Sequence, residues 1–196
     1  MTLLIAGLVL FIGAHAVTMM RDVRAELIGR MGEGLYKGFY SLASGAGLAL
    51  IVWGYIQYRA SGYIPVWEPP RWTRHLAWTL MLPVFPLLIA TYVPGRIKAA
   101  LKHPMLVAVK IWALAHLLAN GDLGSILLFG SVLAWAIIDR ISLKRRAVQS
   151  EVAAARAPDA ATATRNDVIA IVVGLAIYAA VLLWLHPILF GVSARA

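Results

Sequence analysis

Apolar runs long enough to cross a bilayer alternate with short polar segments along almost the whole chain. A helix of about 20 apolar residues spans the hydrocarbon core of a membrane. The pattern therefore predicts an all-α fold, a polytopic integral membrane bundle of about six transmembrane helices. We expect these helices at residues 3–20, 35–58, 75–93, 104–119, 123–138 and 168–189.

Proline and small residues modify two of these predicted helices. Pro83 and Pro86 lie inside the third and predict a kink, because proline removes a backbone donor and clashes with the preceding turn. One side of the second helix carries small residues that favour close approach of a neighbouring helix. These residues are Ser41, Ser44, Gly45 and Gly47.

The longest polar connection covers residues 140–167, which are first basic and then rich in Ala and Thr. We expect a mobile cytoplasmic loop with a short helical start. The other connections are short, and Asn120-Gly121-Asp122 makes the fourth and fifth helices an antiparallel hairpin. Residues 1–196 thus form a single transmembrane domain.

The composition excludes several classes of protein. Hydrophobic residues make up 61% of the chain and the mean hydropathy is +0.79, against about 45–50% apolar residues in soluble domains. The absence of cysteine excludes disulfides, iron–sulfur clusters and thiolate ligands. Ala14-His15-Ala16 resembles a signal-peptidase site, but no basic segment precedes the apolar run, so we expect the first helix to be retained.

The basic residues lie between the apolar runs, where they predict orientation rather than nucleic-acid binding. Twelve Lys and Arg residues follow the odd-numbered helices, and four lie on the other side. Because cytoplasmic loops carry the excess of positive charge, both termini are predicted to be periplasmic, in a bacterial inner membrane. We expect membrane lipid as a partner and no nucleic acid.

The fourth helix carries more polar side chains than a membrane anchor needs. A charged group at the centre of a bilayer costs about 2.5–3.5 kcal/mol on insertion scales, so such groups mark functional sites. His103 and Lys110 are seven residues apart on one face, near the predicted inner surface, and are candidate catalytic residues. His116 and Asn120 share another face toward the outer surface.

His15 of the first helix and His116 differ in predicted depth by about 8–10 Å. Two axial histidines on one iron need side chains that meet across such a gap, so heme b is feasible as a cofactor. The alternative is that each histidine is a hydrogen-bonded structural group. For His75 and His186, near the predicted surfaces, an interfacial role is favoured. For Lys110 we expect a buried partner such as a carboxylate or a backbone carbonyl.

Several segments together resemble the NnrU family of small bacterial membrane proteins. The most specific are KHPM, WALAHLLANGD and DRISLKRR; RMGEGLYKGFY, WTRHLAWTLMLP and HPILFGVS add to them. The resemblance covers nearly the whole chain except the Ala- and Thr-rich stretch after Arg146. The family is associated with nitrogen-oxide metabolism in denitrifying bacteria.

The family also looks distantly similar to the 15-cis-zeta-carotene isomerases, which are heme b enzymes with two histidine ligands. That resemblance implies His15 and His116 as the metal ligands, and it matches His103 with the histidine of an HP motif. A further distant branch contains membrane methyltransferases. These bind S-adenosylmethionine at the cytoplasmic face, although the carboxy-terminal motif that they generally need is not evident in this chain.

Three hypotheses follow, from different functional classes. The first is a heme b protein with His15 and His116 as axial ligands, assisted by Asn120. Its activity would be redox-linked or isomerase-type chemistry on a small or lipophilic substrate, linked to nitrogen-oxide metabolism. The second is an S-adenosylmethionine-dependent membrane methyltransferase with a site near His103 and Lys110. The third is a non-catalytic membrane subunit for assembly or transport.

Overall fold

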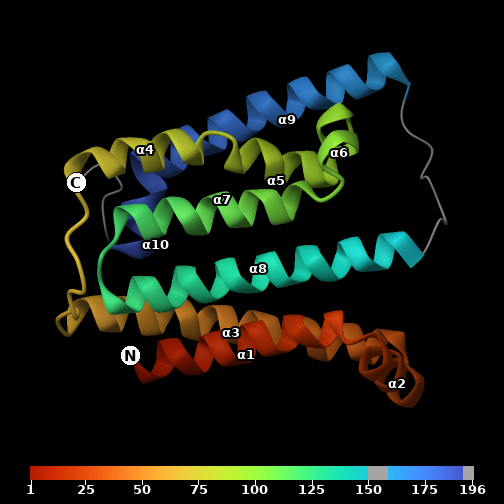
Figure 1. The fold of residues 1–196 in the computed structure, drawn as a ribbon, viewed down its shortest axis with the longest axis horizontal. Helices are drawn as coiled ribbons and strands as arrows, with labels where there is room; N and C mark the ends of the chain where they lie inside the picture. Colours follow the sequence, from red (N-terminus) through yellow and green to blue (C-terminus); the bar gives the residue numbers. More distant parts are fainter. Residues whose placement is uncertain (150–158, 192–196) are drawn as a thin grey trace. The chain divides into compact units, whose positions relative to one another are not determined.

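The computed structural model describes residues 1–149 and 159–191, in which every regular element is a helix (Figure 1). Five helical segments in these ranges are long and apolar enough to cross a membrane, so the predicted all-α polytopic bundle is confirmed. They are Thr2–Met19, Glu33–Ala60, Arg71–Tyr92, Leu123–Arg145 and Ala160–Phe190. The remaining predicted span is the 16-residue helix α7 (Pro104–Ala119). At 1.5 Å per residue it is about 24 Å long, shorter than a bilayer core of about 30 Å.

The helices form two compact units. Unit 1 comprises Met1–Trp67 and Gly121–Ser142, and unit 2 comprises Glu68–Asn120 and Leu143–Ala196.

Unit 1 is built on the antiparallel pair α1 (Thr2–Met19) and α3 (Glu33–Ala60). Glycines allow their backbones to touch: a Cβ on Gly47 would lie 2.8 Å from the Phe11 nitrogen, and one on Gly54 would collide with Leu4. The predicted small-residue face is therefore correct at Gly47. It is wrong at Gly45, which faces open space because it lies on another side of the helix.

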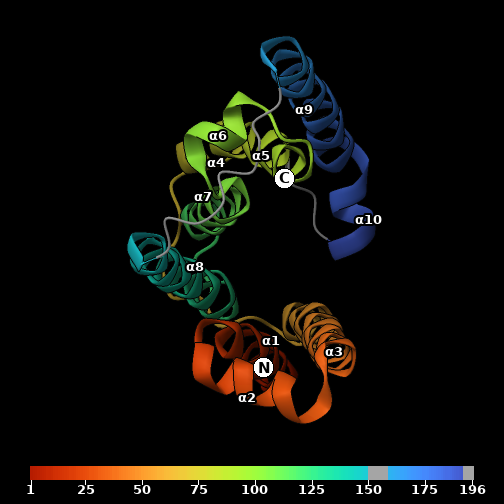
Figure 2. The same ribbon diagram turned by 90° about the vertical axis from the view of Figure 1, so that its right-hand side faces the viewer.

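Two further helices complete unit 1. The short helix α2 (Arg21–Met31) lies across the ends of α1 and α3 (Figure 2). The first part of α8 (Leu123–Gln149) runs beside α3, where Gly124 packs directly against the Tyr58 ring. At the end of unit 1 far from α2, the α3–α4 connection is hydrogen-bonded to the start of α8. The Val66 amide donates to the Gly121 carbonyl at 2.8 Å, and the Leu123 amide donates to the Ile64 carbonyl at 2.9 Å.

Unit 2 begins with the third predicted span, which is divided into α4 (Arg71–Met81) and α5 (Val84–Tyr92). The break falls at Pro83, so the predicted kink is confirmed. The short helix α6 (Arg96–Leu101) and α7 follow, and α7 packs against α4 and α5. The buried side chains Val84, Leu87 and Ala108 form the core between α5 and α7.

The last span of unit 2 consists of α9 (Ala160–Ala180), the π-helical turn η1 (Val181–Leu185) and α10 (His186–Phe190). α9 packs on α5, where Gly174 lies against Pro86. Asp167 of α9 accepts hydrogen bonds from the backbone amides of Arg96 at 3.0 Å and Ile97 at 3.2 Å. It thereby satisfies two amides at the start of α6 that have no partner within that helix.

The loop predicted at 140–167 is wrong at both ends. Residues 140–149 continue α8, because Leu, Lys, Arg, Ala and Gln are good helix formers once the apolar run has ended. α9 begins at Ala160, where Asp159 accepts a hydrogen bond from the Thr162 amide at 2.9 Å. This hydrogen bond holds the pKa of Asp159 below its usual value. The predicted mobility of residues 150–158 lies outside the described residues.

Candidate functional site

His15 lies in α1 of unit 1 among aromatic side chains. Its ring packs against Phe11 at 4.2 Å, Tyr40 at 5.4 Å and, edge to face, Trp135 at 5.1 Å between centroids. Its Nδ1 is 2.8 Å from the carbonyl oxygen of Phe11. Because a carbonyl only accepts, Nδ1 carries the proton, and the Nε2 of the neutral ring carries a lone pair.

His116 lies in α7 of unit 2 and makes the same local contact. Its Nδ1 donates to the Trp112 carbonyl, one turn earlier, at 2.8 Å, and its ring packs on the Trp112 side chain at 5.1 Å. The neutral ring therefore again carries its lone pair on Nε2. Both predicted metal ligands thus have the tautomer that histidine ligands adopt when the other ring nitrogen donates to a backbone carbonyl.

Asn120 ends α7 rather than projecting as a separate polar group. Its Nδ2 donates to the His116 carbonyl at 2.9 Å, and its own backbone amide is 3.0 Å from the same oxygen. The side chain thereby satisfies a carbonyl in the last turn of the helix. Asn120 was predicted to contact the cofactor directly. Its side chain instead binds the backbone carbonyl of His116, so it acts on the cofactor site only through that residue.

His186 belongs to the same unit as His116, which the sequence reasoning did not use. It follows the π-helical turn η1, and its ring packs at a tilt against that of Phe190, with 5.1 Å between centroids. The two side chains, of His116 and His186, are near enough that a positive charge on His186 would disfavour one on His116. π-helical turns are often found at functional sites. The Leu-His-Pro sequence at the end of this turn could have marked His186 as a candidate site residue.

Lys110 lies in α7, and His103 is the residue that directly precedes this helix. Lys110 is half-buried in the middle of the helix. Within the described ranges Lys110 makes no hydrogen bond or ion pair, so the partner expected for it is not found there. His75 is exposed on α4, with its ring edge to face with Trp78.

Lys102, directly before His103, has a strained backbone. Its φ of 60° and ψ of −42°, with the His103 amide 2.7 Å from the Leu101 carbonyl, define a γ-turn of the rare strained type. This turn joins α6 to α7 and fixes the direction in which the His-Pro pair leaves it. The sequence contains no glycine here to reveal it.

A second polar cluster, in unit 1, was missed by the sequence reasoning. Asp122 is 3% exposed; it pairs with Arg59 at 3.2 Å and accepts a hydrogen bond from the Ser125 hydroxyl at 2.7 Å. The Tyr55 and Ser125 hydroxyls are 2.8 Å apart. We call Tyr55, Arg59, Asp122 and Ser125 the α3–α8 network. The sequence could have revealed the role of Asp122, because an Asp directly before an apolar run is typical of a helix N-cap.

Helices that are long and apolar enough to cross a bilayer, with polar side chains held within them, define a multi-pass helical membrane protein. The chain belongs to the NnrU family: the family model described as NnrU protein matches residues 3–194, nearly the whole chain. The predicted family is therefore confirmed. No curated protein and no solved structure matches the chain.

Proposed function

We propose that this protein is a heme b protein of the bacterial inner membrane, in which the imidazoles of His15 and His116 would hold the iron. Its activity is redox-linked or isomerase-type chemistry on a small or lipophilic substrate, linked to nitrogen-oxide metabolism through the NnrU family.

The observation that supports this proposal is that the two imidazoles share one tautomer and one hydrogen-bonding pattern. Both lie in apolar helices, and both donate Nδ1–H to the carbonyl four residues earlier, at 2.8 Å. This hydrogen bond fixes the ring orientation and makes Nε2 a better electron-pair donor. Histidine pairs of this kind bind heme iron in helical membrane proteins.

Heme b supplies, when bound, an iron centre that exchanges single electrons. The polypeptide contributes the rest: the carbonyls of Phe11 and Trp112 hold the two ring tautomers, and Asn120 holds the backbone of His116. The aromatic rings of Phe11, Tyr40 and Trp135 contact the His15 imidazole and hold it in place.

The absorption spectrum of detergent-purified protein, expressed with ample heme, tests the proposal. We expect a Soret band that shifts on reduction. His15→Ala and His116→Ala should each change its position or abolish it, because each removes one axial ligand. His75→Ala is the matched control, since His75 is exposed on α4.

Two results would contradict the assignment. A wild-type protein without a Soret band would remove heme from the proposal. A spectrum that is lost in His186→Ala but unchanged in His15→Ala would place both ligands in unit 2, where His186 interacts with His116.

A second candidate function is methyl transfer from S-adenosylmethionine near His103 and Lys110. The observation that favours it is the strained turn at Lys102, because strained backbone clusters at functional sites. Calorimetric titration of heme-free protein with S-adenosylmethionine should then show binding that weakens in Lys110→Met. Absence of binding to the wild-type protein would eliminate this candidate.

A further inference from the structure

Three buried side-chain polar atoms in the described ranges make no hydrogen bond, and all three belong to unit 1. They are Tyr36 Oη, Ser44 Oγ and Trp135 Nε1. Leaving such an atom unpaired costs about 1–3 kcal/mol. Folded proteins normally satisfy such atoms with protein groups or ordered water.

Two of these atoms, those of Tyr36 and Ser44, belong to the same helix, with Tyr40 midway between them. Tyr36, Tyr40 and Ser44 are spaced four residues apart, so they follow one another along one face of α3. The Tyr40 hydroxyl lies near that of Ser44, yet Ser44 Oγ makes no hydrogen bond of acceptable geometry. We call Tyr36, Tyr40, Ser44 and Trp135 the hydroxyl row.

The row ends at His15. The rings of Tyr40 and Trp135 both contact the His15 imidazole, at 5.4 Å and 5.1 Å between centroids. Since the Phe11 carbonyl occupies Nδ1, the row ends beside a ring whose other nitrogen, Nε2, is the one proposed to hold the iron.

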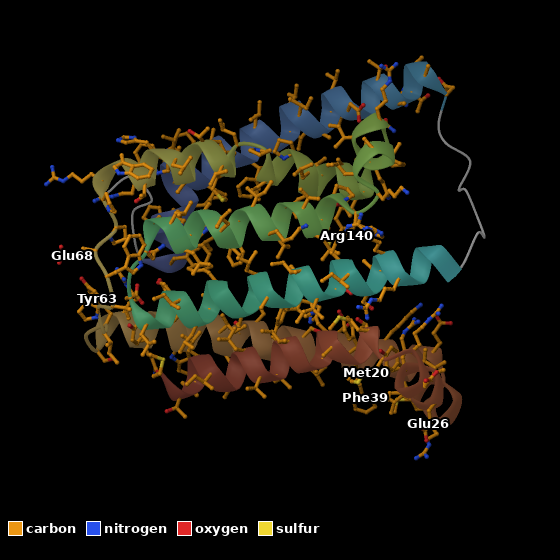
Figure 3. The ribbon with its side chains drawn as sticks, in the orientation of Figure 1. Met20, Glu26, Phe39, Tyr63, Glu68 and Arg140 are labelled. Carbon is orange, nitrogen blue, oxygen red and sulfur yellow. The ribbon has the colours of Figure 1, made fainter. Side chains whose placement is uncertain are left out.

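The row begins at the end of unit 1 where α2 lies. The Arg24 guanidinium stands 5.9 Å from the centre of the Tyr36 ring, and the charge of Asp139 acts on the Tyr40 hydroxyl. Figure 3 shows Met20 and Arg140 toward this end of unit 1, with Tyr63 at the opposite end. Ionisable side chains therefore flank the start of the row.

Beyond His15 the α1–α3 interface is tightly closed. The backbones touch at Gly47 and Gly54, and the side chains of Leu4, Leu8 and Ile51 between them are at most 7% exposed. This apolar contact offers no hydrogen-bonding side chain. The hydroxyl row therefore lies on the α2 side of this closed contact, and His15 stands at its inner end.

We propose that the hydroxyl row holds water molecules that carry protons between the α2 end of unit 1 and the site at His15. Each hydroxyl or water accepts a proton on a lone pair and releases its own to the next group, so no electrons are transferred and no other bond changes. Trp135 only donates, so it orients a water without passing a proton on. The proposal does not rest on heme binding, because the unpaired atoms belong to the polypeptide.

Hydrogen–deuterium exchange of the indole N–H groups in the full-length protein tests for this water. Although Trp135 Nε1 is buried, its proton should exchange within minutes, because water lies beside it. Ser44→Val fills the row with a methyl group and should slow the exchange of Trp135 and of the His15 ring proton by about tenfold or more. Tyr40→Phe, which keeps the ring, should slow the exchange of the His15 ring proton.

Ser41→Val is the matched control, because Ser41 is exposed on the same helix and should leave the exchange unchanged. Trp53, which is 61% exposed, reports free exchange in every variant. Exchange of wild-type Trp135 over many hours would show a dry row and overturn the proposal. Fast exchange that neither Ser44→Val nor Tyr40→Phe slows would overturn it equally, because water would then arrive by another route.

Discussion

The Asp122 carboxylate joins three parts of unit 1 through one side chain. It pairs with Arg59 at the end of α3, binds the amide and hydroxyl of Ser125 in the first turn of α8, and lies beside Pro65 in the connecting loop. Because Asp122 is almost fully buried, its charge depends on these partners for stabilisation. Single residues at this end therefore hold α3 and α8 together.

Asp122→Ala should lower the free energy of unfolding by about 2–4 kcal/mol, since it removes the ion pair and the helix cap together. The change is measured as a shift of the thermal unfolding midpoint in detergent. Glu33→Gln is the control: its ion pair with Lys37 is exposed to solvent, so its loss should leave the unfolding midpoint unchanged. Equal effects of the two substitutions would show that the α3–α8 network contributes no special stability.

At the scale of elements, glycine decides which helices make backbone contact. Gly7, Gly47 and Gly54 let α1 and α3 touch, and Gly174 does the same for α9 on α5. Transmembrane helices gain little from burying apolar side chains, which lipid also accommodates, so such close packing is a main source of their association. The sequence revealed small residues in α3 but not which of them contact α1.

Gly54→Ala should destabilise unit 1 by about 1–3 kcal/mol, because the new methyl group collides with the backbone of Leu4 and forces α1 away. Gly45→Ala, on the same helix but facing open space, should be neutral or stabilising by up to about 1 kcal/mol. Thermal unfolding of the two variants in one detergent compares them directly. A Gly45→Ala protein less stable than Gly54→Ala would contradict the α1–α3 interface.

At the scale of the whole molecule, the charge distribution predicts the orientation in the membrane. Lys and Arg concentrate in the connections after odd-numbered spans, which include α2. The α2 end of unit 1 should therefore face the cytoplasm, and the α3–α4 connection should face the periplasm. In this orientation the hydroxyl row opens toward the cytoplasm.

The absence of cysteine allows this orientation to be measured with single introduced thiols. Glu26→Cys, on the exposed surface of α2, should resist a membrane-impermeant maleimide in intact spheroplasts. Tyr63→Cys, at a site that is 51% exposed at the opposite end of unit 1, should react within minutes. The reverse labelling pattern would invert the proposed orientation and place the opening of the hydroxyl row in the periplasm.

The sequence by itself determined the class of fold, the apolar core of each long helix, the kink at Pro83 and the family. These follow from hydropathy, from proline geometry and from local motifs, which act over neighbouring residues. It also singled out His15 and His116, because polar groups are conspicuous in apolar helices. It failed where a helix continued into water after its apolar run, at residues 140–149.

The tertiary structure alone decided which side chains meet. Trp135 and His15, or Arg59 and Asp122, are far apart in the chain and come together only because glycines bring α1 against α3 and because α8 runs beside α3. Local pattern carries no information on such pairs. The unpaired atoms of the hydroxyl row have the same origin, since an atom is buried or satisfied only in the packed protein.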